Sequence, residues 1–318
     1  MIDERHDNQP MTTTVAVLAV RRPAALGYLA AIAAVLITGV YPALTRLSVT
    51  TTLTPADLLL FRLGVSGLLF APFLFVHARE IPKADWLSGL PLSFLHGWGM
   101  AGCVVFGLRY APASHAAALG PGAIAAWIAL IGFIAYGVRV HMRRLAGISI
   151  IVAGVGLILG ASYGGLSVAT AMIGDVMFLM ASAFGASYLV YIQQRRLNPV
   201  LAAALVCVAS AMIVVPWHYA FAASAIATAP LREILWQLLL QGVLVGCLAF
   251  FALNYATLTI GSQTVGVLSA LVPIIGAVCS LLIARDSISY LEWTAITVIS
   301  AGVAVASLPG ARTRRSRH

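Results

Sequence analysis

Apolar residues run for about 20 positions at a time along this chain, and short polar connections separate the runs. Runs such as IAAVLI and IIVAGVGLIL lack the alternation of a membrane β-barrel strand, so they indicate helices. Each run is long enough to cross a hydrocarbon core of about 30 Å. The pattern predicts ten transmembrane helices, near residues 24–45, 56–77, 87–108, 113–136, 144–161, 172–193, 199–219, 233–257, 263–284 and 290–308.

The second half of the sequence repeats the first at an offset of about 145 residues. Tyr110 recurs as Tyr255, and Gly154 recurs as Gly302. Each copy carries five apolar segments, and an odd number of crossings makes the second copy enter the membrane from the opposite side. We therefore predict an all-α integral membrane protein with ten transmembrane helices in two inverted five-helix repeats, which is a design of alternating-access transporters.

The composition supports the membrane interpretation. Hydrophobic residues make up 61% of the chain and charged residues 9%, against about 25% charged residues in an ordinary soluble domain, and the mean hydropathy is +0.98. We expect the first repeat at 24–161 and the second at 172–308. The polar leader at 1–23 is expected to be disordered and cytoplasmic, and a basic cytoplasmic tail is expected at 309–318.

Basic residues are distributed unevenly among the connections. The net charge of +9 and the sequence pI of about 9.8 would suit nucleic acid. However, with both termini placed in the cytoplasm, fourteen of the 19 Lys and Arg residues fall on the cytoplasmic side, four fall outside, and Arg62 lies within a helix. This distribution obeys the positive-inside rule. We therefore expect a multi-pass protein with both termini cytoplasmic and the lipid bilayer as a partner, and we expect no nucleic acid to bind.

Three stretches resemble a known family. They are TGVYPALTR, TPADLLLFRLGVSGLLFAPF and the long run FALNYATLTIGSQTVGVLSALVPIIGAVCSLLIARDSISYLEWTAITVISAGV. Together they are similar to the EamA family of the drug/metabolite transporter superfamily, over about residues 24–308. The resemblance implies a ten-helix bundle with a central cavity that exports amino acids or other small metabolites across the bacterial inner membrane. Where that family often has Gly-Glu at the end of the ninth helix, this chain has Arg285-Asp286.

The sequence contains no pattern typical of an enzyme or a metal site. It has no G-x-x-x-x-G-K-[ST] and no H-E-x-x-H, and its four cysteines lie singly inside apolar segments. We therefore predict neither catalysis nor a cofactor nor a bound metal.

Polar residues deep inside apolar helices are costly, which makes them candidates for function. His96 is predicted near the middle of the third helix, and Gln241 lies at the matching place in the eighth helix, on one face with Gln237. We expect these side chains to line the substrate cavity. The alternative is that His96 and Gln241 only form hydrogen bonds between helices.

Two helices are predicted to border the same cavity because their sequences contain helix breakers at matching positions. The fourth helix is expected to be interrupted at Gly120-Pro121-Gly122, and the ninth contains Ser269 and Pro273 in the corresponding stretch. Interrupted helices at equivalent places in two repeats are typical of a transporter binding site.

Four further residues complete the predicted cavity. Trp127 with Tyr41 or Tyr188 is expected to supply aromatic wall. Arg62 either extends outward past Asp57 or meets a carboxylate of the substrate.

Small residues four positions apart allow helices to approach closely. Gly242-x-x-x-Gly246 and Gly156-x-x-x-Gly160 are expected to pack inside the bundle, with a homodimer face as the alternative. The sequence therefore leaves both a monomer and a homodimer open.

Two classes of function remain. The inverted repeat favours a secondary transporter that moves a small-molecule substrate by alternating access, with amino-acid export ahead of nucleotide-sugar or drug transport. The other class is a non-transporting membrane subunit that keeps the same fold.

Overall fold

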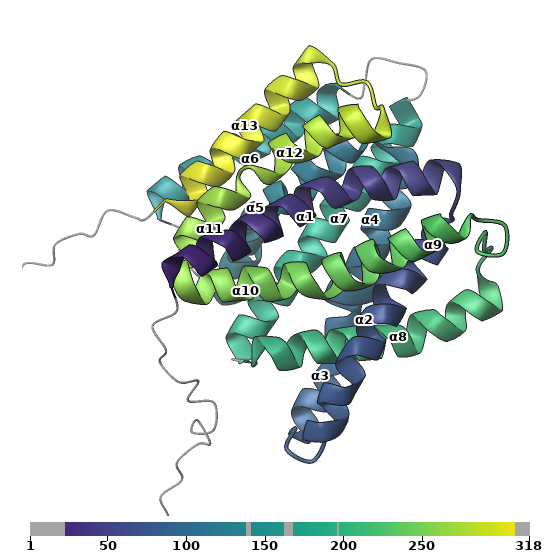
Figure 1. Ribbon diagram of the computed structural model, residues 1–318. Helices are drawn as coiled ribbons and strands as arrows, with labels where there is room; N and C mark the ends of the chain where they lie inside the picture. The colour runs from purple at the N-terminus through teal and green to yellow at the C-terminus, as the bar shows by residue number, and fades with distance from the viewer. Residues whose placement is uncertain (1–22, 138–140, 162–167, 196, 309–318) are drawn as a thin grey trace, which may run out of the picture.

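The computed structural model describes residues 23–137, 141–161, 168–195 and 197–308, and these residues form helices without any strand (Figure 1). The first repeat contains α1 (Ala24–Thr51), α2 (Pro55–His77), α3 (Lys83–Leu92), η1 (Ser93–Trp98), α4 (Gly99–Tyr110), α5 (Ala113–Tyr136) and α6 (Met142–Ala161). The second repeat contains α7 (Val168–Arg195), α8 (Pro199–Phe221), α9 (Leu231–Gln237), η3 (Leu238–Leu248), α10 (Ala249–Ile260), α11 (Ser262–Ser269), α12 (Val272–Cys279), η4 (Ser280–Ala284) and α13 (Tyr290–Ser307). The predicted leader 1–23, except Pro23, and the predicted tail 309–318 lie outside the described residues.

Joined end to end, these helices make ten spans that are long and apolar enough to cross a membrane. The third span consists of α3, η1 and α4, the eighth of α9, η3 and α10, and the ninth of α11, α12 and η4. The prediction of ten transmembrane helices is confirmed. Most of the predicted ends differ from the observed ones by a few residues because the helices extend beyond the apolar stretches.

Local hydrogen bonds define several helix starts. The side chain of Thr54 accepts a hydrogen bond from the backbone N–H of Asp57, whose carboxylate accepts one in return from the N–H of Thr54. Ser289 and Glu292 make the same reciprocal pair at the start of α13, and Asn198 caps α8. Such caps satisfy N–H groups that the first turn of a helix leaves without partners.

The packing of the helices shows the symmetry of the two repeats. The second spans of the two repeats, α2 and α8, pack against each other, and so do the fifth spans, α6 and α13. The contact of α1 with α12 has its counterpart in that of α7 with α5, and the contact of α1 with α10 has its counterpart in that of α7 with α4. The repeats are therefore interleaved, and most of the large helix contacts join one repeat to the other.

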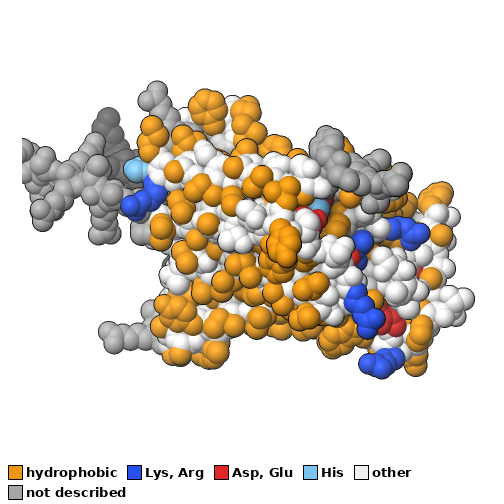
Figure 2. All heavy atoms as spheres, turned by 90° about the horizontal axis from the view of Figure 1, so that it is seen from above, with side chains coloured by type: hydrophobic (Ala, Val, Ile, Leu, Met, Phe, Trp, Pro, Cys, Tyr) orange, Lys and Arg blue, Asp and Glu red, His pale blue; other side chains and the backbone are white. Residues whose placement is uncertain are grey.

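The bundle has two polar ends and an apolar waist. The described chain begins and ends at one end, called here the terminal end, whereas α1 ends and α13 begins at the other, the far end (Figure 1). Figure 2 shows Lys or Arg side chains toward both ends and the visible Asp and Glu side chains toward one of them, with hydrophobic side chains between the ends. Large apolar side chains such as Leu68, Phe75 and Leu282 are more than 70% exposed. An apolar belt of this kind is what a surrounding bilayer stabilises.

Glycines set the closest helix contacts. A Cβ placed on Gly147 would lie 2.5 Å from the backbone nitrogen of Ala306, so α6 and α13 touch backbone to backbone. Gly242 packs closely on the side chain of Val65 and the backbone of Phe61 in α2, which confirms the predicted packing role of Gly242-x-x-x-Gly246.

The prediction for Gly156-x-x-x-Gly160 is wrong. Both glycines are exposed, and a Cβ on either would meet nothing within 4 Å. The close packing of α6 uses Gly147 and Gly154 instead, because these two lie on the face toward α13.

Two wide helical turns lie at equivalent places in the repeats. η1 and η3 are π-helical, with hydrogen bonds that span one residue more than those of an α-helix. Adding the offset of 145 to Ser93 gives 238, the first residue of η3. Within η1, Gly97 has φ −89° and ψ −112°, which is not helical. Wide turns of this kind occur frequently at functional sites.

The expected interruption is present in only one of the two predicted helices. The ninth span breaks after Ser269, and α12 restarts at Val272 with Pro273 in its first turn. The fourth span, in contrast, is a continuous helix in which Pro121 is an interior residue. The prediction of an interrupted fourth helix is wrong, because a single proline removes only one backbone hydrogen bond and neighbouring helices support the rest.

Candidate functional site

Four of the predicted cavity residues lie near one another at the centre of the bundle. The guanidinium of Arg62 lies over the ring of Tyr41, 5.5 Å from its centroid. The charge of Arg62 also acts on the imidazole of His96, which stacks on Tyr188 with the ring centroids 4.2 Å apart and the planes at 16°. We call Tyr41, Arg62, His96 and Tyr188 the Arg62 cluster.

Both repeats contribute to the Arg62 cluster. Tyr41 comes from α1, Arg62 from α2 and His96 from η1, whereas Tyr188 comes from α7 of the second repeat. Cys207 of α8, whose side chain is buried, lies near both Arg62 and Tyr188 and completes the surroundings.

The cluster contains polar atoms with no hydrogen-bond partner. These are Nη1 of Arg62, Nδ1 of His96 and the hydroxyl oxygen of Tyr188, all of them buried. Buried polar atoms without partners are rare in proteins and carry a free-energy penalty. Three of them in one neighbourhood indicate a place for a polar ligand.

Gln237 and Gln241 lie elsewhere, against α1. The side-chain amide of Gln241 donates to the hydroxyl of Thr45 at 2.7 Å, and that of Gln237 donates to the hydroxyl of Ser48 at 2.7 Å. Ser48 in turn donates to the carboxylate of Glu233. The two glutamines thus form a line of hydrogen bonds between the eighth span and α1, with only Oε1 of Gln241 left without a partner.

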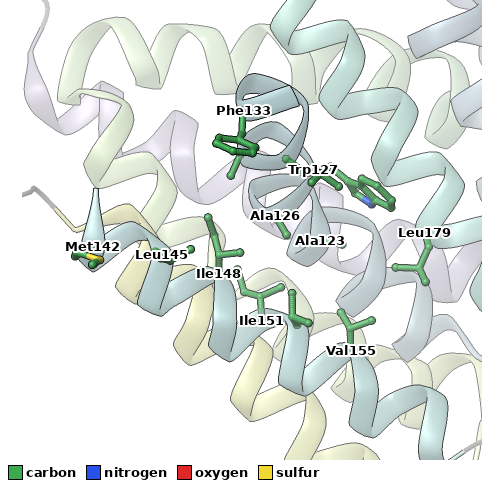
Figure 3. Close-up of a pocket in the computed structure, with 13 residues that line it drawn as sticks. Ala123, Ala126, Trp127, Phe133, Met142, Leu145, Ile148, Ile151, Val155 and Leu179 are labelled. Carbon is green, nitrogen blue, oxygen red and sulfur yellow. The ribbon is translucent and has the colours of Figure 1, made fainter. Parts of the chain in front are cut away.

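The remaining predicted residues surround other parts of the bundle. Trp127 lines an apolar groove of about 820 Å³ between α5, α6 and α7, with Leu179 at one side (Figure 3). Ser269 donates to the backbone carbonyl of Val265 at the break of the ninth span, and Pro121 lies along α5. Because every side chain lining the groove of Trp127 is apolar except the indole N–H, this groove offers little to recognise a polar substrate.

Buried carboxylates concentrate at the far end. Asp57 is fully buried and accepts hydrogen bonds from Nε2 of His218 at 2.9 Å, from the hydroxyl of Ser224 at 2.7 Å and from the N–H groups of Ala225 and Thr54, both at 3.0 Å. These bonds use both carboxylate oxygens. Among the described residues, Asp57 therefore has its hydrogen-bond partners without Arg62, with which it forms no ion pair.

Two further carboxylates contact the buried imidazole of His115 on α5. Its Nδ1 lies 2.7 Å from Oδ1 of Asp175 on α7, and its Nε2 lies 2.9 Å from Oε1 of Glu292 on α13. With both ring nitrogens bonded to carboxylate oxygens, the imidazole joins three spans.

The third far-end contact involves the Arg285-Asp286 pair. Asp286 forms an ion pair with Nε of Arg46 at 2.9 Å and accepts a hydrogen bond from the N–H of Ala113, the first residue of α5. Arg285 has φ 57°, and Gly137 at the end of α5 has φ 63°. Arg285 and Gly137 thus end equivalent helices of the two repeats in the left-handed conformation. Glycine suits such a helix end because it adopts this conformation without strain.

Each of these far-end contacts joins the first repeat to the second. Asp57 meets α8 and the following loop, His115 meets α7 and α13, Asp286 meets α1 and α5, and Glu233 meets α1. Sequence reasoning did not predict them. The sequence does show that histidines and acidic residues lie at predicted helix ends. It does not show which of them pair, because the pairing depends on how the two repeats interleave.

Among the described residues, no group of three or more His, Cys, Asp or Glu side chains has an arrangement that would hold a metal ion.

Comparisons with known proteins agree with this architecture. The model of the EamA-like transporter family matches residues 25–160 and 172–308, one match for each repeat. Eight solved chains are similar in structure. One of them, titled "Crystal structure of protein", has a TM-score of 0.61 and 19% identity, with 92% of this chain and 99% of that chain covered, which shows a shared fold. No curated protein matches the sequence.

Proposed function

Because the chain belongs to the EamA-like transporter family over both of its repeats, we propose that it is a secondary transporter that exports amino acids or similar small metabolites across the bacterial cytoplasmic membrane. It moves its substrate by alternating access and carries out no chemical reaction on it.

The observation that carries the proposal is the Arg62 cluster. Unpartnered polar atoms of Arg62, His96 and Tyr188 are buried at a place to which both repeats contribute. A substrate bound there contacts both repeats, as a transporter in which one half moves against the other around a fixed site requires. A non-transporting subunit has no need to keep buried polar groups without partners, since each carries a cost in stability.

The far-end contacts support alternating access. They join helices of the two repeats at the far end through charged and hydrogen-bonded groups, and we interpret the conformation as closed there. Nearer the terminal end, the hydroxyl groups of Ser88 and Tyr191 form a hydrogen bond of 3.0 Å between the repeats. The positive-inside rule makes the far end the outer one, so the closed end faces the outside in this proposal.

Counterflow in proteoliposomes tests the proposal. Vesicles containing the purified protein are loaded with one unlabelled amino acid or organic acid, and uptake of the same labelled compound is followed against vesicles without protein. We expect transient accumulation of the label for at least one compound of the panel. A flat time course for every compound, with the protein correctly folded in the vesicles, would contradict transport.

A further inference from the structure

Arg62 is a cation inside the bundle for which the described protein supplies no anion. It lies seven residues beyond Pro55, about 10 Å into the span at 1.5 Å per residue. It forms no ion pair with a described residue, and its Nη1 is buried without a hydrogen-bond partner. A charge at this depth is expensive unless an opposite charge or strong acceptors accompany it.

All the described carboxylates lie away from Arg62. Asp57, Asp175, Asp286, Glu233 and Glu292 take part in the far-end contacts. The two others, Glu80 and Asp85, lie at the terminal end, beside the connection between α2 and α3. The charge of Arg62 would therefore be balanced by an anion from outside the described protein.

The groups around Arg62 suit a carboxylate on a flat organic body. The Tyr188 hydroxyl and the imidazole of His96 are further hydrogen-bonding groups without partners, and a guanidinium binds the two oxygens of a carboxylate side by side. The rings of Tyr41, His96 and Tyr188 supply aromatic carbon beside the guanidinium, although each already has one face in contact with Arg62 or with the other ring.

The same surroundings lack a partner for an ammonium group. Because no described carboxylate lies in the cluster, a positively charged substituent next to Arg62 would meet repulsion from the guanidinium and no opposite charge. We propose that the Arg62 cluster binds the carboxylate of a small organic acid, that Arg62 supplies the opposite charge, and that an ammonium group on the substrate is not required. This proposal rests on the transport function proposed above for the same site.

Three related compounds separate these requirements. 3-Phenylpropionate carries only the carboxylate, L-phenylalanine carries both charges, and L-phenylalaninamide carries only the ammonium group. Unfolding temperatures of the full chain in detergent are measured against the concentration of each compound. We expect 3-phenylpropionate to raise the unfolding temperature and L-phenylalaninamide to leave it unchanged.

Variants link the effect to Arg62. Arg62→Gln should weaken the apparent affinity for 3-phenylpropionate about tenfold or more, because a hydrogen-bonded charge pair is lost. Arg62→Lys should retain more of it. The matched control is Arg109→Gln, which removes an exposed arginine at the far end and should change nothing.

Three results would overturn the proposal. One is equal protection of the wild-type protein by the amide and the acid, which needs no variant to be folded. The second is unchanged affinity in Arg62→Gln, and the third is the absence of protection by 3-phenylpropionate. Counterflow with the same compounds keeps the two proposals apart. Binding of the acid without counterflow would contradict transport alone, whereas counterflow that favours the amide and is indifferent to Arg62→Gln would contradict the anion site alone.

Discussion

The contact between α6 and α13 allows a test in which two glycines of the same helix give opposite results. A methyl group on Gly147 would lie 2.5 Å from the nitrogen, 2.7 Å from the Cα and 2.8 Å from the Cβ of Ala306. Non-bonded carbon atoms prefer separations of about 3.5–4.0 Å. Because two of the three atoms belong to the backbone, no side-chain rotation relieves the overlap, and the helices have to separate. On Gly156 the same methyl group meets nothing within 4 Å.

The substitutions Gly147→Ala and Gly156→Ala share the same effect of helix propensity on stability but differ in their effect on packing. Both gain about 0.5–1 kcal/mol because alanine favours a helix over glycine. Only Gly147→Ala loses the roughly 1–3 kcal/mol that overpacking a tight contact costs. The shared gain cancels in the comparison, so Gly156→Ala should be more stable than Gly147→Ala by about 1–3 kcal/mol.

Unfolding by SDS in mixed micelles, followed by tryptophan fluorescence, measures this difference. We expect the transition of Gly147→Ala at a lower SDS fraction than wild type and that of Gly156→Ala at or above it. Equal midpoints for the two variants, or a less stable Gly156→Ala, would refute the packing of α6 on α13 described here and would restore the role first expected for Gly156.

Three further predictions follow from the helix ends. Arg285→Gly should raise the free energy of unfolding by about 1 kcal/mol, because glycine removes the strain of a left-handed residue; a loss of stability in the same SDS titration would argue against that conformation. A double-mutant cycle with Arg46→Ala and Asp286→Ala should give a coupling of about 1 kcal/mol or more, and additive effects would mean that the 2.9 Å pair contributes nothing. Reporters fused after Arg79 and after Arg232 should report a cytoplasmic and an outer location respectively, whereas a cytoplasmic signal from the second fusion would rule out the ten-span topology.

The sequence predicts the spans well because each one is bounded by strong local signals. For example, the fifth span begins where an apolar run follows Arg143, and the tenth begins after the capping residue Ser289. Offset comparison of the two halves predicts the inverted repeat, which the matching helix contacts and the two family matches confirm.

The candidate site is harder to predict because it depends on which faces meet. Gln241 and His96 occupy equivalent places in the repeats, yet Gln241 bonds to Thr45 while His96 stacks on Tyr188. The difference arises from the side chains of the neighbouring helices, and the periodicity of a single helix cannot predict it. The partner of Asp57 is likewise invisible in sequence, since His218 lies 161 residues away.

The two wide turns also determine where the chain can lose a residue. In an α-helix each residue turns the chain by about 100°, so deleting one residue from an ordinary span turns everything beyond it away from its neighbours. A π-helical turn holds one residue more than an α-helical turn. We therefore expect a single deletion inside η1 or η3 to be taken up partly by the wide turns, and to turn the residues on either side away from their neighbours less than the same deletion in a regular span. The third and eighth spans thus each have a short stretch in which a change of length is partly absorbed locally, at the same place in both repeats.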